Sequence, residues 1–119
     1  MDTNTTSQIG AMYRALKEIA DGTSYDLTLR QLLVLLHVGS KTSPLNQNQI
    51  AEAQDLYKST TSKIIANLTG TGGDVKRKGG LGMLDIDLDP ADFRSRIVSL
   101  SKEGERLLTR AMKQAGVRA

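Results

Sequence analysis

The chain of 119 residues contains no cysteine. Disulfide bonds, thiolate metal sites and thiol-based redox sensing are therefore excluded, and the absence is typical of proteins from a reducing compartment. The polar start, MDTNTTSQ, has neither the basic nor the apolar segment of a secretion signal. The longest apolar run, residues 32–36, is far shorter than the about 20 residues that span a bilayer. We therefore expect a cytoplasmic protein without a membrane partner.

Aromatic residues are also scarce, at 3% of the chain, with no tryptophan and a single phenylalanine. Proteins that bind single-stranded nucleic acid usually stack bases on several exposed rings, so this mode of binding is not expected. The core must be aliphatic, and a chain of this length is most simply one domain, residues 1–119. A formal net charge of +3 permits a nucleic-acid partner without requiring one.

The charges divide the middle of the chain into a basic segment and an acidic segment. Between residues 56 and 84 the only acidic residue is Asp74, and the basic residues are Lys58, Lys63, Lys76, Arg77 and Lys78. The acidic segment, residues 85–92, contains no basic residue, and its aspartates are Asp85, Asp87, Asp89 and Asp92. Six of the eleven glycines fall within residues 70–82, which predicts a flexible basic loop there. This loop lacks the residue spacing of a phosphate-binding loop.

Residues 45–69 predict two short helices joined by a tight turn, a helix-turn-helix with a polar leading end. Asn46 can cap the first helix, in which Gln49 is the third residue. Asp55 tolerates the left-handed conformation that such a turn needs, and Leu56 is placed to pack between the helices. The residues expected on the buried side of the second helix are Ile64, Ile65 and Leu68.

Three further helices are predicted around this motif. The first covers about residues 7–21, with Ser7 as its cap. The second begins after Thr28 and is apolar nearly all round, so it should be the central helix, buried on more than one side. The last covers about residues 102–115 and is capped by Ser101.

Residues 83–100 predict a hairpin of two strands, because apolar and acidic residues alternate in its first half. The residues expected to face the body of the protein are Leu84, Ile86 and Leu88. Asp85 and Asp87 would then point outward, where Arg94 or Arg96 on the second strand could pair with them.

The predicted order is three helices, of which the second and third form the helix-turn-helix, then a hairpin and then a last helix, and this is the order of a winged helix-turn-helix. Particular residues resemble the MarR family of transcriptional regulators. The most specific match is the stretch DFRSRIVSLSKEG, residues 92–104, which is similar to the family's D-R-R-x-x-x-V-x-L-T-x-x-G pattern. Further matches are Leu27-Thr28, residues 45–52 and Ser59-Thr60. The resemblance covers about residues 27–104. The expected fold class is mainly α (α+β), with a two-stranded β-hairpin wing and terminal dimerisation helices.

The resemblance implies a homodimer that binds double-stranded DNA as a sequence-specific transcriptional regulator, in the role of a repressor. Recognition helices would enter successive major grooves, and wings would reach adjacent minor grooves. The residues expected at DNA are Tyr57, Lys58, Ser59, Thr60, Ser62, Lys63, Lys76, Arg77, Lys78, Arg94 and Arg96. Those expected at the dimer interface are Ile9, Met12, Leu16, Ile19, Leu107, Leu108, Ala111 and Met112. The resemblance also suggests a small-molecule effector.

A second hypothesis is a winged-helix adaptor that binds a protein partner through its recognition helix or acidic wing without reading DNA. An enzyme is not expected, because there is no cysteine nucleophile and the one histidine, His37, lies near a helix end where a structural role is favoured. No cofactor or metal is expected. Asp85 and Asp87 alternate along a strand, and no glutamate follows them at the spacing of a calcium loop.

Overall fold

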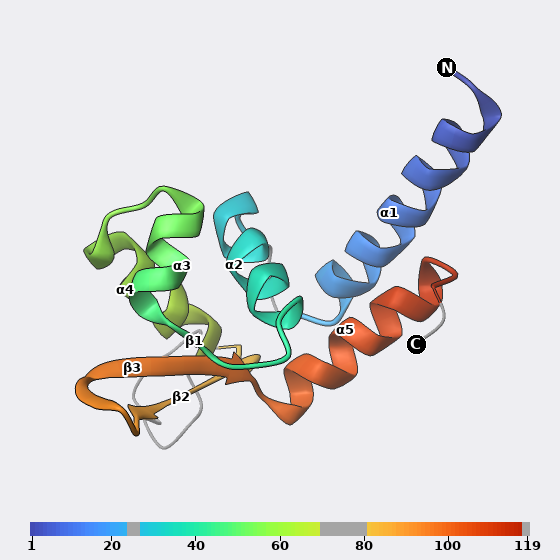
Figure 1. Ribbon diagram of the computed structural model, residues 1–119. Coiled ribbons are helices and arrows are strands. Elements are labelled where there is room, and N and C mark those ends of the chain that lie inside the picture. Colours follow the sequence, from blue (N-terminus) through green and yellow to red (C-terminus); the bar gives the residue numbers. More distant parts are fainter. Residues whose placement is uncertain (24–26, 70–80, 118–119) are drawn as a thin grey trace.

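The computed structural model describes residues 1–23, 27–69 and 81–117, apart from the side chain of Phe93 (Figure 1). Its elements are, in chain order, α1 (Thr3–Asp21), α2 (Leu29–Gly39), β1 (Leu45–Asn46), α3 (Gln47–Gln54), α4 (Lys58–Thr69), β2 (Leu84–Asp89), β3 (Asp92–Leu100) and α5 (Lys102–Gln114). Within these ranges, five helices and a three-stranded antiparallel sheet confirm the predicted mainly α (α+β) class. Of the helices described, none is long and apolar enough to cross a membrane.

The molecule is elongated, with extents of 50 × 28 × 25 Å, and its helices form two groups (Figure 1). α2, α3 and α4 gather with the sheet at one end, whereas α1 and α5 lie side by side and extend away from them. Arg14 Nε donates a hydrogen bond to the backbone oxygen of Gln114 at 2.9 Å, and Arg110 Nε lies 3.4 Å from Glu18 Oε1. The two terminal helices therefore hold each other within one chain.

The sheet has the strand order β1-β3-β2, and both strand pairs are antiparallel. The prediction of a two-stranded hairpin was therefore incomplete. β1 is a strand of two residues that immediately precedes α3, with Leu45 opposite Val98 and Asn46 opposite Ile97. A strand this short has no alternation that a sequence pattern could detect, because only its pairing with β3 defines it. On its other side β3 pairs with β2, which is an edge strand.

Side-chain caps begin three of the helices, as the sequence predicted. Thr28 Oγ1 accepts a hydrogen bond from Gln31 N at 3.1 Å at the start of α2, and Asn46 Oδ1 accepts one from Gln49 N at 2.8 Å at the start of α3. In both cases the Oε1 atom of the glutamine accepts a hydrogen bond from the backbone N–H of the capping residue, at 2.9 Å, which completes a capping box. Ser101 caps α5. These local signals fix the beginnings of the helices that surround the turn.

The predicted start of α1 was wrong. The cap is Asp2, whose carboxylate accepts a hydrogen bond from Thr5 N at 2.7 Å, and not Ser7. This bond lowers the pKa of the Asp2 carboxyl below its ordinary value. The first residues of α1 are polar, and its first large apolar residue is Ile9. The apolar periodicity therefore could not show where the helix begins.

The core is aliphatic, and α2 lies at its centre, in contact with α3, α4 and β3. Val34, Leu35 and Val38 are the residues that α2 buries. The prediction of a central helix that is buried on more than one side is thus confirmed, although Leu29 is 71% exposed and Leu33 is 37% exposed. Leu32 and Leu36 are partly buried and also pack against the core.

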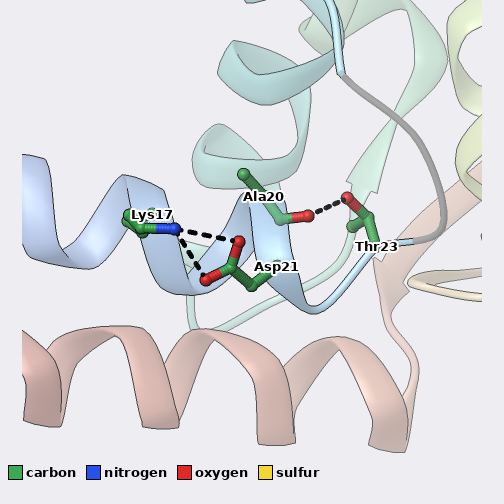
Figure 2. A network of polar contacts seen from close by, with 4 residues as sticks. All are labelled: Lys17, Ala20, Asp21 and Thr23. Atoms are coloured by element: carbon green, nitrogen blue, oxygen red, sulfur yellow. Dashed lines mark hydrogen bonds and ion pairs between the residues drawn. The ribbon is translucent and has the colours of Figure 1, made fainter.

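A small network of polar contacts lies at the carboxyl end of α1 (Figure 2). Lys17 Nζ donates to both carboxylate oxygens of Asp21, at 3.1 and 3.3 Å, and Thr23 Oγ1 donates to the backbone oxygen of Ala20 at 3.1 Å. The hydrogen bond to Asp21 and the charge of that residue raise the pKa of the Lys17 ammonium group. Both partners of this pair are exposed, so it contributes little to stability.

Candidate nucleic-acid interface

The turn between α3 and α4 has the geometry that the sequence predicted. Asp55 is the only non-glycine residue with a positive φ among those described, at 54°, in the left-handed region. Leu56 N then donates to Ala51 O at 2.9 Å, and Leu56 packs against the core. Arg30 Nη1, on α2, donates to Gln54 O at 3.2 Å and holds the end of α3. The turn therefore fixes the direction in which α4 starts.

α4 has a buried side and an exposed side along its whole length. Its buried residues are Thr61, Ile64, Ile65 and Leu68, which confirms the three aliphatic positions that the sequence predicted. Thr61 Oγ1 donates to Tyr57 O at 3.0 Å, which satisfies the buried hydroxyl. The predicted contact residues on this helix are all exposed: Lys58, Ser59, Thr60, Ser62 and Lys63. Tyr57, just before the helix, is 85% exposed.

The exposed side of α4 continues beyond the predicted contact residues. Ser62, Lys63, Ala66 and Asn67 line a shallow groove of about 300 Å³. Ala66 and Asn67 were not predicted as site residues. The signal for them was present, because each stands four positions after a predicted contact residue and therefore lies on the same side of the helix. α4 contains two lysines and no carboxylate.

The carboxyl end of α4 is fastened by residues 81–83, which we call the strap. Its backbone N–H groups donate to carbonyl oxygens of the last turn of α4: Leu81 N to Asn67 O at 3.0 Å, Gly82 N to Thr69 O at 2.9 Å, and Met83 N to Leu68 O at 2.8 Å. The last carbonyl oxygens of an α-helix need partners from outside the regular helical pattern, and the strap supplies hydrogen bonds to three of them. The strap therefore fastens the carboxyl end of α4 to the segment that leads into β2.

The strap also joins α4 to the start of α5. Ser101 N donates to Met83 O at 3.0 Å, and Ser101 Oγ donates to Gly82 O. Gly104 N in turn donates to Ser101 Oγ at 3.0 Å. A Cβ atom at Gly104 would lie only 2.2 Å from Met83 O, so this close approach requires a glycine. α5 is thereby connected to α4 through the three residues of the strap.

The hairpin places its arginines differently from the prediction. Arg96 lies opposite Leu88, and residues directly opposite in an antiparallel pair share one face of the sheet. Asp85 and Asp87 lie opposite Ser99 and Ile97, on the other face. The predicted pairing of Arg96 with these aspartates was therefore wrong. The pairing register depends on the contact between two strands, which the alternation within one strand does not specify.

The tip of the hairpin is largely exposed. Leu88 was predicted to face the body but is 47% exposed, whereas Leu84 is buried. The register shifts between Leu88 and Asp89, and Arg94 N donates to Asp92 Oδ1 at 3.0 Å. The Arg94 and Arg96 side chains are exposed, so both remain accessible to a partner. Lys76, Arg77 and Lys78, the basic residues predicted to contact DNA from the glycine-rich loop, lie outside the described residues.

The predicted dimer residues fall into two groups. Ile9, Met12 and Met112 are exposed, and Leu16 and Leu108 are half-buried. The structure assigns the other three to the core of one chain: Ile19, Leu107 and Ala111. Within one chain the packing of α1, α5 and the body already covers these three residues, and the dimer interface itself stays a prediction.

A larger groove of about 720 Å³ runs along α5, on a different side from Leu107 and Ala111. Its residues are Gly39, Leu100, Glu105, Leu108, Thr109, Met112, Lys113, Gly116 and Val117.

His37, near the end of α2, has a buried Nδ1 atom without a hydrogen-bond partner in the part of the chain that the structure describes.

No protein-family model and no curated protein sequence matches the chain. Solved structures do match it. A probable transcriptional regulator from Pseudomonas aeruginosa is 25% identical with a TM-score of 0.60, over 97% of this chain and 78% of that one. A MarR-family transcriptional regulator from Rhodococcus sp. RHA1 is 22% identical with a TM-score of 0.60, over 92% and 65%. The S. aureus MepR–DNA complex is 20% identical with a TM-score of 0.66, over 86% and 73%.

The chain thus has the winged-helix fold of MarR-family transcriptional regulators, which confirms the resemblance seen in the sequence. It spans between about two thirds and four fifths of the length of these three structures. In the terms of this fold, α3 and α4 form the helix-turn-helix, with α4 as its second helix, and the β2–β3 hairpin is the wing.

Proposed function

We propose that the chain is a double-stranded DNA-binding transcriptional regulator that reads DNA with the exposed side of α4. The observation that carries this proposal is the strip of hydroxyl, amine and amide groups on α4, which contains no carboxylate. Such groups contact phosphates and base edges, and the major groove admits an α-helix. The similarity to a structure determined as a DNA complex supports the proposal.

Within this proposal each contact has a chemical role. Lys58 and Lys63 neutralise phosphates or contact base edges, and the serine and threonine hydroxyls supply adaptable hydrogen bonds. Arg94, on the wing, reaches a minor groove, whose negative potential attracts arginine. Lys76, Arg77 and Lys78 add phosphate contacts from the glycine-rich loop.

The regulator acts as a homodimer and a repressor in this proposal. Exposed apolar side chains on both terminal helices support the dimer, since Ile9, Met12 and Met112 would otherwise stay in contact with water. A twofold arrangement would present two copies of α4 to half-sites about one helical turn apart. The groove beside Leu108 and Met112 would accept a small, mostly apolar effector.

The experiment that tests this function is selection of bound duplexes from a random pool by the purified chain. We expect a pseudo-palindrome with half-sites about one helical turn apart, which would establish the register and the dimer together. Affinity for that duplex should fall steeply with salt, because bound counterions are released. Absent or salt-insensitive binding to every duplex at high protein concentration would contradict the proposal.

A second candidate function is an adaptor that binds a basic protein partner along the acidic wing. The observation that favours it is the edge strand β2, on which Asp85 and Asp87 both point to the face opposite Arg96. A pull-down from native extract, with Asp85→Asn combined with Asp87→Asn as the control bait, separates the two functions. Recovery of nucleic acid alone by both baits would remove the adaptor.

A further inference from the structure

The residues that line the groove on α4 differ in size and in chemistry. Ala66 has the smallest side chain of the four residues that line the groove, which also include Lys63 and Asn67, and we call the surface at Ala66 the recess. Ser62 completes the lining. Ala66 is partly buried, whereas the other three residues are exposed. The recess is therefore a small apolar surface next to an amide and a hydroxyl group.

The last turn of α4 holds this groove in a fixed shape. The backbone N–H groups of the strap donate hydrogen bonds to the carbonyl oxygens of Asn67, Leu68 and Thr69. Thr69 Oγ1 lies 3.0 Å from the carbonyl oxygens of both Ile65 and Ala66. A side chain that is presented from such a rigid turn loses little freedom when it binds, which favours specific contacts over adaptable ones.

The Asn67 side chain is available for an outside partner. It is exposed, and within the described residues its carboxamide makes no hydrogen bond to the protein. A carboxamide carries one acceptor oxygen and one donor nitrogen side by side. In the major groove this pair matches adenine, which presents its N6 amino group as a donor and N7 as an acceptor.

The Ala66 recess matches the other feature of an A·T pair. Thymine carries a 5-methyl group in the major groove, and small apolar side chains such as alanine contact it. Guanine and cytosine have no such methyl group. Lys63, at the rim, is suited to a phosphate or to guanine and does not compete for the methyl group.

We propose that the groove of Ser62, Ala66 and Asn67 reads A·T pairs, with the Asn67 carboxamide on adenine and the Ala66 recess on a thymine methyl. This inference rests on the proposed DNA-binding function and adds which bases α4 prefers and which residues prefer them. It adds Ala66 and Asn67, in the third turn of the helix, to the lysines and hydroxyls proposed above to contact phosphates and base edges.

The test uses the duplex that the wild-type chain selects, with single atoms of its bases changed. Each adenine of the half-site is replaced in turn by 7-deazaadenine, which lacks the N7 acceptor, and each thymine by uracil, which lacks the methyl group. At one adenine position we expect about tenfold weaker binding, within the range for a bidentate base contact. At one thymine we expect about fourfold weaker binding, the value of one buried methyl group.

The variant Asn67→Ala tests whether the loss of affinity caused by 7-deazaadenine comes from the contact with Asn67. The variant should bind the unmodified duplex about tenfold more weakly and should no longer respond to 7-deazaadenine at the sensitive position, since the two changes remove the same contact. The variant should fold, because alanine is a better helix former than asparagine. Asn4→Ala on α1, also exposed, is the matched control and should keep full affinity and full sensitivity.

Three results would overturn the inference. Asn67→Ala could leave affinity unchanged, or weaken binding to all duplexes equally, or keep its sensitivity to 7-deazaadenine. In each case the DNA-binding function would stand, with α4 reading sequence through other residues. If instead the wild-type chain selected no duplex, the proposed function and this inference would fail together, so the two failures are distinguishable.

Discussion

α4 and the wing are both exposed, and both are predicted to meet DNA, but their charges differ. The exposed side of α4 carries Lys58 and Lys63 without any carboxylate. The wing carries Arg94 and Arg96, but also two aspartates that point outward from its edge strand. Because DNA is a dense polyanion, a carboxylate near it is repelled. We infer that α4 supplies most of the affinity, and that the wing contributes through its arginines alone.

The difference also offers a structural reason for the acidic strand. β2 is the edge of the sheet, with backbone groups on its outer side that could pair with another chain. Charged residues that alternate along an edge strand prevent such pairing. Asp85 and Asp87 would therefore disfavour edge-to-edge pairing with another copy, whether or not a partner binds there. The cost of this protection is weaker attraction between the wing and DNA.

The largest expected effect comes from damage to the support that both regions share. Gly104→Ala puts a Cβ atom against Met83 O and should lower the free energy of unfolding by about 1–3 kcal/mol, the usual cost of overpacking. Urea denaturation followed by circular dichroism measures it. Gly10→Ala, in the open middle of α1, is the control and should be neutral or stabilising. Equal stability of the Gly104 variant and the wild type would mean that the strap is not needed.

The next effect separates α4 from the rest of the surface. Lys63→Ala should weaken binding to the selected duplex by about tenfold and reduce the salt slope by about 1, if the lysine neutralises a phosphate. Fluorescence anisotropy at several salt concentrations measures both quantities. Lys17→Ala removes the same charge from α1, where the ammonium group is held by Asp21, and should change neither. Equal losses in both variants would reduce the role of Lys63 to net charge.

A smaller effect tests the turn that aims α4. Asp55→Ala forces a residue with a Cβ and no polar side chain into the left-handed region, and should cost about 1 kcal/mol of folding free energy. Asp55→Gly is the matched variant and should cost less, because glycine adopts this conformation without strain. Thermal unfolding of the pair decides the matter. The prediction is wrong if the glycine variant is the less stable one.

The smallest effect tests the wing directly. Asp85→Asn combined with Asp87→Asn should strengthen DNA binding by about two- to threefold, since two repulsive charges are removed from an exposed and screened surface. Asp21→Asn combined with Glu103→Asn is the control for total charge and should have a smaller effect. Weaker binding by the wing variant would show that the aspartates assist DNA binding, which would reverse the comparison with α4.

The parts of the fold that could be predicted are the parts determined by neighbours along the chain. Asn46 with Gln49, Thr28 and Ser101 each act within one turn, so their capping roles are visible in the sequence. The left-handed Asp55 is equally local. In the candidate site, the exposure of Ser59 and Lys63 followed from the burial of Ile64 and Ile65 on the opposite side of the same helix.

The parts that could not be predicted depend on contacts between distant segments. The face on which Arg96 lies is set by the register between β2 and β3. The burial of Ile19 and Leu107 in one chain results from α1 packing on α5, whereas an apolar stripe alone fits a core and a dimer equally well. Asn67 could have been identified from helical spacing, but the groove beside it appears only once the helix is placed.

The sequence by itself determined that this protein has a helix-turn-helix, where its helices are capped, and that its basic and acidic residues occupy separate segments. These properties depend on backbone preferences and on periodicity, which act over a few residues. Only the tertiary structure decided the third strand, the face of each wing residue and the strap that joins α4 to α5. Those features consist of hydrogen bonds and packing between segments far apart in the chain, such as Ser101 with Met83, and no local pattern encodes such pairings.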